Sequence, residues 1–534
     1  MPEPNLQAEQ LLAARATRRR FLTVAGAAAA VALSTGLPSA ETATAGRLRR
    51  YPFTLGVASG DPLPDSVVLW TRLAPEPLAP FGGMDWANVV VRWEIARDER
   101  FRHVVDRGTE VARPERSHCV HVDVRGLEPG REYFYRFTTR HESSPVGRTR
   151  TAPAPWWRVR ELEIAYASCQ AWWDGFYSAY DDLARSAPDV VFHLGDYLYE
   201  IGIPADGGLR RDATLPASFR AETVTLDQYR ERYALYKLDA DLQRAHHAAP
   251  WIVTMDDHEV ENNWADEVPE NNVPRDEFVV RRANALRAWW EHMPMRVAQQ
   301  PVGYDMQVHR RFRYGDLAEF SVLDTRQYRS DQVYGDGTKP PGPDTRDPAR
   351  TITGDAQEAW LLDGLAASRA RWNVIPHQTA IMRIDTRAGP DVAVPMDTWD
   401  GYEASRQRVL GGIQERGVEN VVFISGDLHR SLAADLKLDF DDLASPTVAV
   451  EMVGTSISSA RDGEDNDEGG RTILAENPWI KYGNFQRGYV RAKLTHDELR
   501  AEYRVVPYVS RPGAPASTRT TLVVQDGVPG LQTA

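Results

Sequence analysis

The sequence has few cysteines, no serine-nucleophile motif and no nucleotide-binding loop, and each absence argues against one class of protein. Its 534 residues include two cysteines, Cys119 and Cys169, too few for a disulfide framework. Neither GxSxG nor GxxxxGK[ST] occurs, and no serine or threonine stands in a setting that favours a phosphoenzyme. The net charge of −13 argues against nucleic acid as a partner, because phosphate backbones are held by basic patches.

Hydrophobic runs long enough to anchor the chain in a bilayer are also lacking. The alanine-rich run from Phe21 to Leu33 is too short for this purpose. It follows TRRR at residues 17–20 and precedes ATA at 43–45, a small-residue cleavage site, with Ala40 as an alternative. This pattern predicts a twin-arginine export signal over residues 1–45. We therefore expect the twin-arginine translocation machinery as a partner, no stable membrane anchor, and an extracellular or wall-associated mature protein.

The length of the chain favours two domains, and residues 51–155 have the pattern of the first. Short alternating strands separated by glycine and proline turns are typical of an antiparallel β-sandwich. The segment LEPG before Tyr133 resembles the tyrosine corner of fibronectin type III or immunoglobulin-like domains. His118, Cys119 and His121 could suggest a metal site, but in an alternating strand they favour a half-buried structural role.

Residues 156–534 follow a strand, loop and helix pattern, and several apolar strands end in residues that bind metals. The run from Val190 to Leu194 predicts a buried parallel strand that stops at Gly195-Asp196, with Tyr199 three residues on. In α/β sheets ligands bind at the carboxyl ends of the strands. We expect the other strand ends to converge at one edge of a sheet with Asp196: Cys169, Asp256-Asp257-His258, His377 and Asp427-Leu428-His429.

The ligand types indicate which metals such a site would hold. A thiolate and a phenolate suit ferric iron, whereas carboxylates suit calcium, magnesium or manganese. A carboxylate that bridges two ions sets them about 3.5–4 Å apart, as in two-metal phosphoester hydrolysis. We therefore expect direct attack on the phosphate ester by metal-bound hydroxide, with His258 or a neighbour protonating the leaving alkoxide.

Six segments together resemble the PhoD-like family of secreted alkaline phosphatases and phosphodiesterases, and the match extends from about residue 51 to the carboxyl terminus. The GDxxY part of the second segment is also similar to purple acid phosphatases. The resemblance implies an α/β fold: an N-terminal antiparallel β-sandwich (fibronectin/Ig-like) followed by a metallophosphoesterase α/β sandwich domain. It also implies ferric iron with one or two calcium ions. The six segments are YASCQ, HLGDYLYE, DDHEVENNWAD, LDTRQYR, DTWDGY and SGDLHRS.

The resemblance also implies roles for individual residues. Cys169, Tyr199 and His429 would bind iron, and Asp196 would bridge to calcium. The remaining residues are Asp257 and Asp427 on calcium, His258 as general acid, and Arg430 and Arg326 neutralising substrate phosphate. His377 departs from the family pattern, where an amide is usual, and could add a ligand, which leaves the second metal open.

The sequence leaves the substrate open. Phosphate monoesters or diesters, including phospholipids or wall polymers, fit the resemblance, and a phospholipase D-type phosphodiesterase on the same centre is the main alternative. A secreted non-catalytic protein that binds polymer through the sandwich is a remote one. The acidic segment ARDGEDND, residues 460–467, favours a solvated loop, with a calcium loop as alternative. TTLVVQDGVPGLQTA predicts a strand and a loose tail rather than a helix capping the site.

Overall fold

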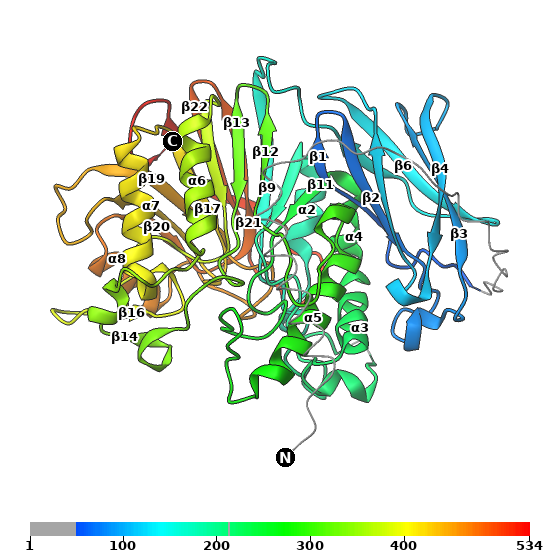
Figure 1. Cartoon of the computed structure of the whole chain (residues 1–534), viewed down its shortest axis with the longest axis horizontal. Coiled ribbons are helices and arrows are strands. Elements are labelled where there is room, and N and C mark those ends of the chain that lie inside the picture. The colour runs from blue at the N-terminus through cyan, green and yellow to red at the C-terminus, as the bar shows by residue number, and fades with distance from the viewer. Residues whose placement is uncertain (1–49, 212–213, 534) are drawn as a thin grey trace, which may run out of the picture.

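The structure is a computed structural model that describes residues 50–211 and 214–533 (Figure 1). The predicted export signal, residues 1–45, lies outside the described residues. Within the described ranges, no helix combines the length and the apolar character needed to cross a membrane.

The N-terminal region is a β-sandwich, seen in blue and cyan in Figure 1. Its outer sheet has the order β4-β3-β6-β7, with β8 also paired to β6, and the other layer is formed by β1, β2 and β5. The hydroxyl of Tyr133 accepts a hydrogen bond from the backbone N–H of Glu128 at 2.9 Å, so the predicted tyrosine corner is confirmed. The strands are β1 Val57–Leu63, β2 Ser66–Arg72, β3 Val89–Ala96, β4 Val104–Ala112, β5 Cys119–Arg125, β6 Glu132–Thr139, β7 Glu142–Ser143 and β8 Gly147–Arg150.

The sandwich is continuous with the rest of the molecule through one long sheet. Strand β1 pairs in parallel with β11 (Pro250–Val253), with Ser59 opposite Pro250 and Gly60 opposite Trp251. This pairing gives a ten-stranded sheet in the order β24-β23-β22-β21-β9-β10-β11-β1-β2-β5. The two predicted regions thus share backbone hydrogen bonds, and residues 151–160 between β8 and β9 form neither strand nor helix. The predicted domain boundary at residue 155 stays a prediction.

The centre of the ten-stranded sheet combines segments from both ends of the chain. Strands β9, β10 and β11 are parallel, as their apolar patterns predict, and β21 pairs antiparallel with β9. The additional strands are β9 Glu161–Ala167, β10 Val190–His193, β21 Arg487–Thr495, β22 Glu498–Val506, β23 Ser517–Gln525 and β24 Gln532–Thr533.

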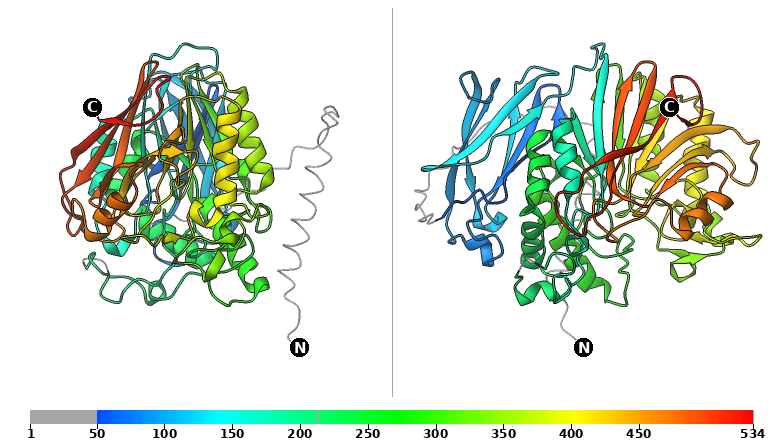
Figure 2. Two further views of the ribbon diagram at one scale, coloured as in Figure 1. Left: turned by 90° about the vertical axis from the view of Figure 1, so that its left-hand side faces the viewer. Right: turned by 180° about the vertical axis from the view of Figure 1, so that it is seen from behind.

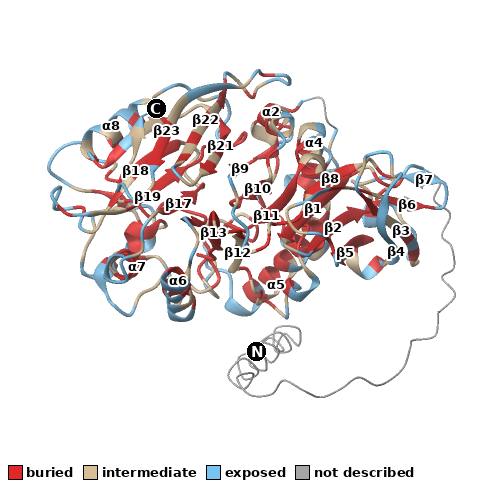
Figure 3. Ribbon diagram, turned by 90° about the horizontal axis from the view of Figure 1, so that it is seen from above, coloured by how far each residue is buried: buried red, intermediate tan, exposed pale blue. Residues whose placement is uncertain are grey.

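A second sheet of seven strands packs face to face on the first. Its order is β12-β13-β15-β17-β19-β18-β20, and β13, β15, β17 and β19 are parallel. A shared apolar core lies between the two sheets, with Phe192 against Phe320 as one contact. Figure 3 shows that the facing strands are mainly buried. The strands are β12 Arg310–Tyr314, β13 Ala318–Val322, β15 Trp372–Pro376, β17 Val421–Ser425, β18 Ser431–Lys437, β19 Thr447–Val453 and β20 Ile480–Asn484.

Helices cover the outer face of each sheet. One core joins α2, α3, α4 and α5 to the ten-stranded sheet, and another joins α6, α7 and α8 to the seven-stranded sheet. In the left view of Figure 2 the C-terminal strands, in red, lie on the far side from α6 and α7. A two-stranded antiparallel ribbon of β14 (Thr338–Lys339) and β16 (Val394–Pro395) lies beside them. The helices are α2 Ser178–Ser186, α3 Leu226–Lys237, α4 Ala240–Ala248, α5 Arg275–His292, α6 Asp355–Ala367, α7 Glu403–Glu415 and α8 Glu468–Glu476.

The helical stretch of residues 226–249 is divided into two helices, α3 and α4. Asp239 lies between them, and its carboxylate accepts hydrogen bonds from the backbone N–H groups of Asp241 and Leu242. This N-cap starts α4 in a new direction, because a capping residue leaves the helical conformation. Both helices pack on the outer face of the ten-stranded sheet, and α3 also contacts the turn after β10, where the Tyr236 hydroxyl accepts a hydrogen bond from the backbone N–H of Tyr199 at 3.1 Å.

Candidate metal centre

The predicted ligands lie on turns that follow strands of both sheets. Cys169 follows β9, Asp196 follows β10, and Asp427 and His429 follow β17. All four have left-handed backbones, with φ of 59°, 54°, 67° and 54° respectively. Side chains larger than glycine adopt this conformation at a cost, and such strain gathers at functional sites. The ligands were predicted at one sheet edge, but they come from the adjoining edges of two stacked sheets.

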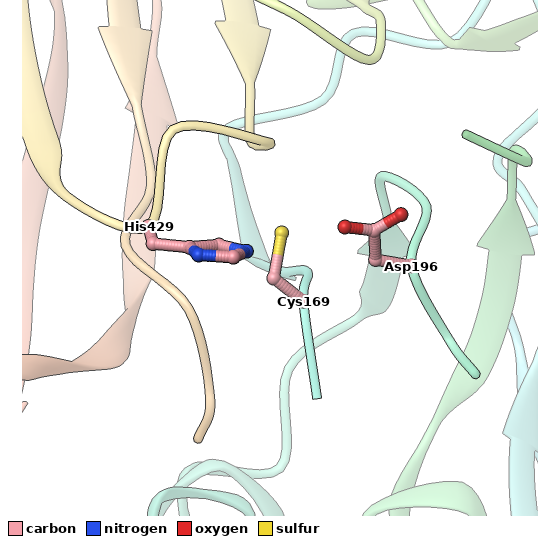
Figure 4. A group of neighbouring side chains, drawn as sticks. All are labelled: Cys169, Asp196 and His429. Carbon is pink, nitrogen blue, oxygen red and sulfur yellow. The ribbon is translucent and has the colours of Figure 1, made fainter. Parts of the chain in front are cut away.

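A first group of potential ligands joins the two sheets. Ligand atoms of Cys169, Asp196 and His429 all lie within 4.8 Å of one another. Figure 4 shows the thiol of Cys169 between the imidazole of His429 and the carboxylate of Asp196. The Tyr199 hydroxyl donates to Asp196 Oδ2 at 2.9 Å and lies 2.9 Å from His429 Nε2. The structure therefore brings together the four residues predicted around iron.

Two further groups share Asp196 with the first. One contains Asp196, Asp257 and His258, and the other contains Asp196, Asp256, Asp257 and Asp427. Asp196 is thus the only described residue that belongs to all three. Asp256 was not among the chosen ligands, although the sequence places it directly before Asp257. Residue type alone does not distinguish two adjacent aspartates at one strand end.

The buried acidic residues of the site are only partly neutralised by the cationic side chains around them. Burial and neighbouring carboxylates raise the pKa of Asp196 well above its usual value, although His258 opposes this, and burial raises that of Asp427 to about 6. Burial likewise raises the pKa of the Cys169 thiol and the Tyr199 phenol. Asp196 Oδ1 and Asp256 Oδ2 have no hydrogen-bond partner among the described residues. Since unpaired buried charge is costly, the donor set fits bound cations.

His258, a member of the second group, is held by the carboxylate of Glu200, which was not among the predicted site residues. Its Nδ1 lies 2.7 Å from Glu200 Oε2, and its ring centroid lies 4.2 Å from that of Tyr199. Burial disfavours the charged imidazole, but Glu200, Asp257 and Asp196 raise the pKa of His258 well above its usual value. Glu200 ends the HLGDYLYE segment, so its closeness to Asp196 in the chain was the available signal.

Arg326 lies behind the aspartates rather than at the opening of the site. Its guanidinium is fully buried and donates to Asp256 Oδ1 at 2.5 Å and to Asp397 Oδ2 at 2.8 Å. The predicted contact with substrate phosphate requires access that this side chain lacks. Its role is therefore corrected: it neutralises part of the buried acidic charge.

His377 lies outside all three groups, contrary to the expectation that it adds a ligand. Its Nε2 is 3.4 Å from Glu451 Oε1, and its ring packs edge-on against Phe423 and Trp399. The physical reason is the alternation of side chains along a strand. His377 continues the face of Ile375 toward the helix-covered core, whereas Gln378 takes the opposite face and donates to Thr254 of the other sheet.

Arg430 and Arg487 lie next to His429: Arg430 follows it in the chain, and Arg487 begins β21 of the ten-stranded sheet. Arg430 pairs with Asp467 at 3.2 Å, stacks over Phe485 at 4.8 Å, and has a side chain 19% exposed. Arg487 Nη1 donates to the backbone oxygen of His429 at 2.7 Å, which holds the turn that carries the imidazole. Arg430 is therefore accessible, as its predicted role requires, and Arg487 supports a ligand from behind.

The acidic loop and the carboxyl terminus do not add to the site. Asp467 caps α8 and pairs with Arg430, and Asp462 accepts hydrogen bonds from the backbone N–H groups of Val509 and Ser510, so both carboxylates have protein partners. Within the described ranges, loop 460–467 contributes to none of the potential metal groups, and the calcium-loop alternative has no support. No helix follows β23 up to residue 533, and the tail returns as β24 instead of hanging free.

Comparisons with known proteins match this architecture. Residues 164–503 match the family model described as PhoD-like phosphatase, and residues 39–153 match the model of the PhoD-like phosphatase N-terminal domain. The chain belongs to the PhoD-like phosphatase family. The predicted resemblance, the fold class and the class of enzyme, a phosphoric ester hydrolase, are confirmed by this membership.

Two similar proteins support the assignment over nearly the full length. Alkaline phosphatase D of Bacillus subtilis (strain 168) is 47% identical over 523 residues, which are 96% of this chain and 88% of that protein. The solved structure of PhoD matches with a TM-score of 0.88 and 48% identity, covering 92% of this chain and 93% of that one. The similarity thus extends over both the sandwich and the two stacked sheets.

Proposed function

We propose that this chain is an exported phosphoester hydrolase with ferric iron and calcium at the centre built around Asp196. One observation carries the proposal: a single buried carboxylate belongs to three groups of potential ligands, so it can bridge two cations. Cys169, Tyr199 and His429 would hold iron with Asp196. Asp257 and Asp427, with Asp256, would hold one or two calcium ions. Bound ions would supply positive charge to the phosphoryl oxygens and lower the pKa of attacking water.

The chain's own residues would handle the proton and the orientation of the ester. Because Nδ1 of His258 is engaged by Glu200, Nε2 is the ring atom free to donate a proton to the leaving oxygen. Arg430, partly exposed beside His429, would add positive charge where the phosphate enters. Tyr199, packed against the His258 ring, would keep that ring in place.

We propose direct displacement without a covalent phosphoenzyme. The site gathers carboxylates, a thiol, a phenol and imidazoles, and the sequence has neither a GxSxG nor a P-loop motif. A chiral phosphorothioate substrate tests this step, because one displacement inverts phosphorus. Retention of configuration would require two displacements and would overturn the proposal.

Elemental analysis of the natively exported protein is the most direct test of the metal assignment. We expect one iron and at least one calcium per chain. A protein that hydrolyses phosphate esters at full rate with neither metal would contradict the proposed centre. Comparing a phenyl phosphate monoester with the corresponding diester on one preparation then separates a phosphatase from a phosphodiesterase of the phospholipase D type. A faster diester reaction would favour the latter.

We also propose export by the twin-arginine route, which carries folded proteins and so permits metal insertion beforehand. The support is the TRRRFL sequence at residues 17–22, followed by a short apolar run. Changing Arg18 and Arg19 together to lysine should leave the precursor in the cytoplasm. Export at the wild-type level would contradict this route.

A further inference from the structure

A buried glutamate connects the two turns that carry aspartates of the site. Glu259 is fully buried, and its Oε2 accepts hydrogen bonds from the backbone N–H groups of Asp196 at 3.0 Å and Asp256 at 2.6 Å. Its Oε1 accepts from the backbone N–H of Tyr197 at 2.6 Å. One carboxylate therefore binds both the turn after β10 and the turn after β11.

These two turns need such a connection because of their conformation and contact. Gly195 and Asp196 have left-handed φ of 111° and 54°. A Cβ placed on Gly195 would lie 2.3 Å from Cβ of Asp256, so the turns touch with no room for a side chain. Both aspartates place a carboxylate oxygen without a partner in the same buried space. Repulsion between these carboxylates would push the turns apart unless something behind them held the backbone.

We propose that Glu259 is a positioning residue that forms the metal centre before any ion binds. This inference rests on the proposed function, because it concerns the same site. The carboxylate neither joins the three ligand groups nor needs the cations for its own contacts, since three backbone N–H donors satisfy it. It would lower the cost of ordering Asp196 and Asp256 when the ions arrive, which is the general effect of supporting residues on metal affinity.

Glu259→Gln tests this role with little change in shape. The amide places a donor where one oxygen now accepts, so at least one backbone N–H group faces another donor. We expect the folded variant to bind iron about 10–100-fold more weakly than the wild type, the range known for outer partners of metal ligands, and therefore to release it faster into a chelator. Release is followed by elemental analysis and by visible absorption, and needs no substrate.

Glu291→Gln provides the matched control. Glu291 is also fully buried and accepts from Arg230 and Arg287, but it lies on α5 outside the described metal groups. We expect this variant to lose thermal stability while releasing iron at the wild-type rate. If Glu259→Gln releases iron at the wild-type rate, or if both variants release it equally fast, the inference is wrong.

Hydrogen exchange on the wild type decides the question even if Glu259→Gln does not fold. After metal removal, the amides of Asp196, Tyr197 and Asp256 should stay as protected as those of β10, because their acceptor remains. Rapid exchange at these amides, with β10 still protected, would overturn the role of Glu259. A wild-type chain that binds no metal would instead overturn the proposed function, so the two failures are distinguishable.

Discussion

The two stacked sheets contribute unequally to the metal centre. The ten-stranded sheet supplies Cys169, Asp196, Tyr199, Asp256, Asp257 and His258 from three successive parallel strands. The seven-stranded sheet supplies Asp427 and His429 from a single turn. The first sheet thus holds most of the negative charge. The second adds His429 to the group with Cys169, and Asp427 to the group with Asp256 and Asp257. The shared carboxylate therefore belongs to the ligand-rich sheet, while the other sheet completes the site.

The largest differences in metal content and activity are expected between variants of the two aspartates, Asp196 of the ten-stranded sheet and Asp427 of the seven-stranded sheet. Asp196→Asn should abolish binding of both metals and reduce activity far more than the ~10–100-fold typical of an outer partner. Asp427→Asn should lose calcium but keep iron, because Asp427 belongs to one group and Asp196 to three. Iron and calcium per chain, measured together with phosphatase rate, give the comparison. Equal losses in the two variants would contradict the central place of Asp196.

Substitution of the ligands that fit iron should change metal binding and activity less than substitution of Asp196. Tyr199→Phe should remove the visible charge-transfer absorption while the fold is kept, because the phenol oxygen is deleted and the ring remains. Cys169→Ser should weaken iron more than calcium, since a thiolate is the softer ligand. Tyr503→Phe, a buried tyrosine on β22, is the control for loss of a hydroxyl. Full colour and rate in both site variants would refute the assignment of iron to this group.

His377→Asn tests how far the seven-stranded sheet enters the centre. The side chain faces Glu451 and the helix-covered core, so the metal content should equal that of the wild type. Thermal stability should fall modestly, because packing against Phe423 and Trp399 is lost. Loss of one metal in this variant would restore His377 as a ligand and make the two sheets more equal.

The smallest effect is expected on the outer face of the ten-stranded sheet, where a buried lysine changes the pH dependence of stability. Burial lowers the pKa of Lys237 from 10.5 to about 7, and its Nζ lies 4.4 Å from the Trp70 ring centroid. Between pH 7 and 10.5 the unfolded chain therefore binds more protons than the folded chain, so stability rises with pH in this window. Lys237→Met should raise the melting temperature at pH 7 and flatten this rise. An unchanged pH profile of unfolding would contradict the lowered pKa.

Much of the site was predictable because strand ends have a local signature. An apolar run that stops at Gly195-Asp196, or at Gly426-Asp427, marks both the strand and the turn, and the motif resemblance assigned the ligands. Local pattern could not show that Asp256 and Glu259 differ in role, because both are acids in one short run. The face of the sheet on which the His377 side chain lies depends on its position in the alternation of side chains along β15, and the sequence alone did not show this position.

The arrangement of the sheets was less predictable for a different reason. Strand β21 carries Arg491 and Lys493 in alternation with buried residues, and this half-polar pattern does not indicate a central position. The paired strands β1 and β11 are far apart in the sequence, with Ser59 opposite Pro250. Their pairing is made by backbone hydrogen bonds, which residue types do not reveal. The helix break at Asp239 did have a signal, since aspartate is a preferred N-cap.

The parallel pairing of β1 with β11 determines how this protein can be dissected. A fragment beginning at residue 156 would expose the backbone N–H and C=O groups of β11 along an open sheet edge. Such edges recruit strands from other molecules, so this fragment should form aggregates rather than a smaller soluble enzyme. The N-terminal region therefore covers one edge of the catalytic sheet. Replacing it with an unrelated domain that lacks a matching strand would expose this edge.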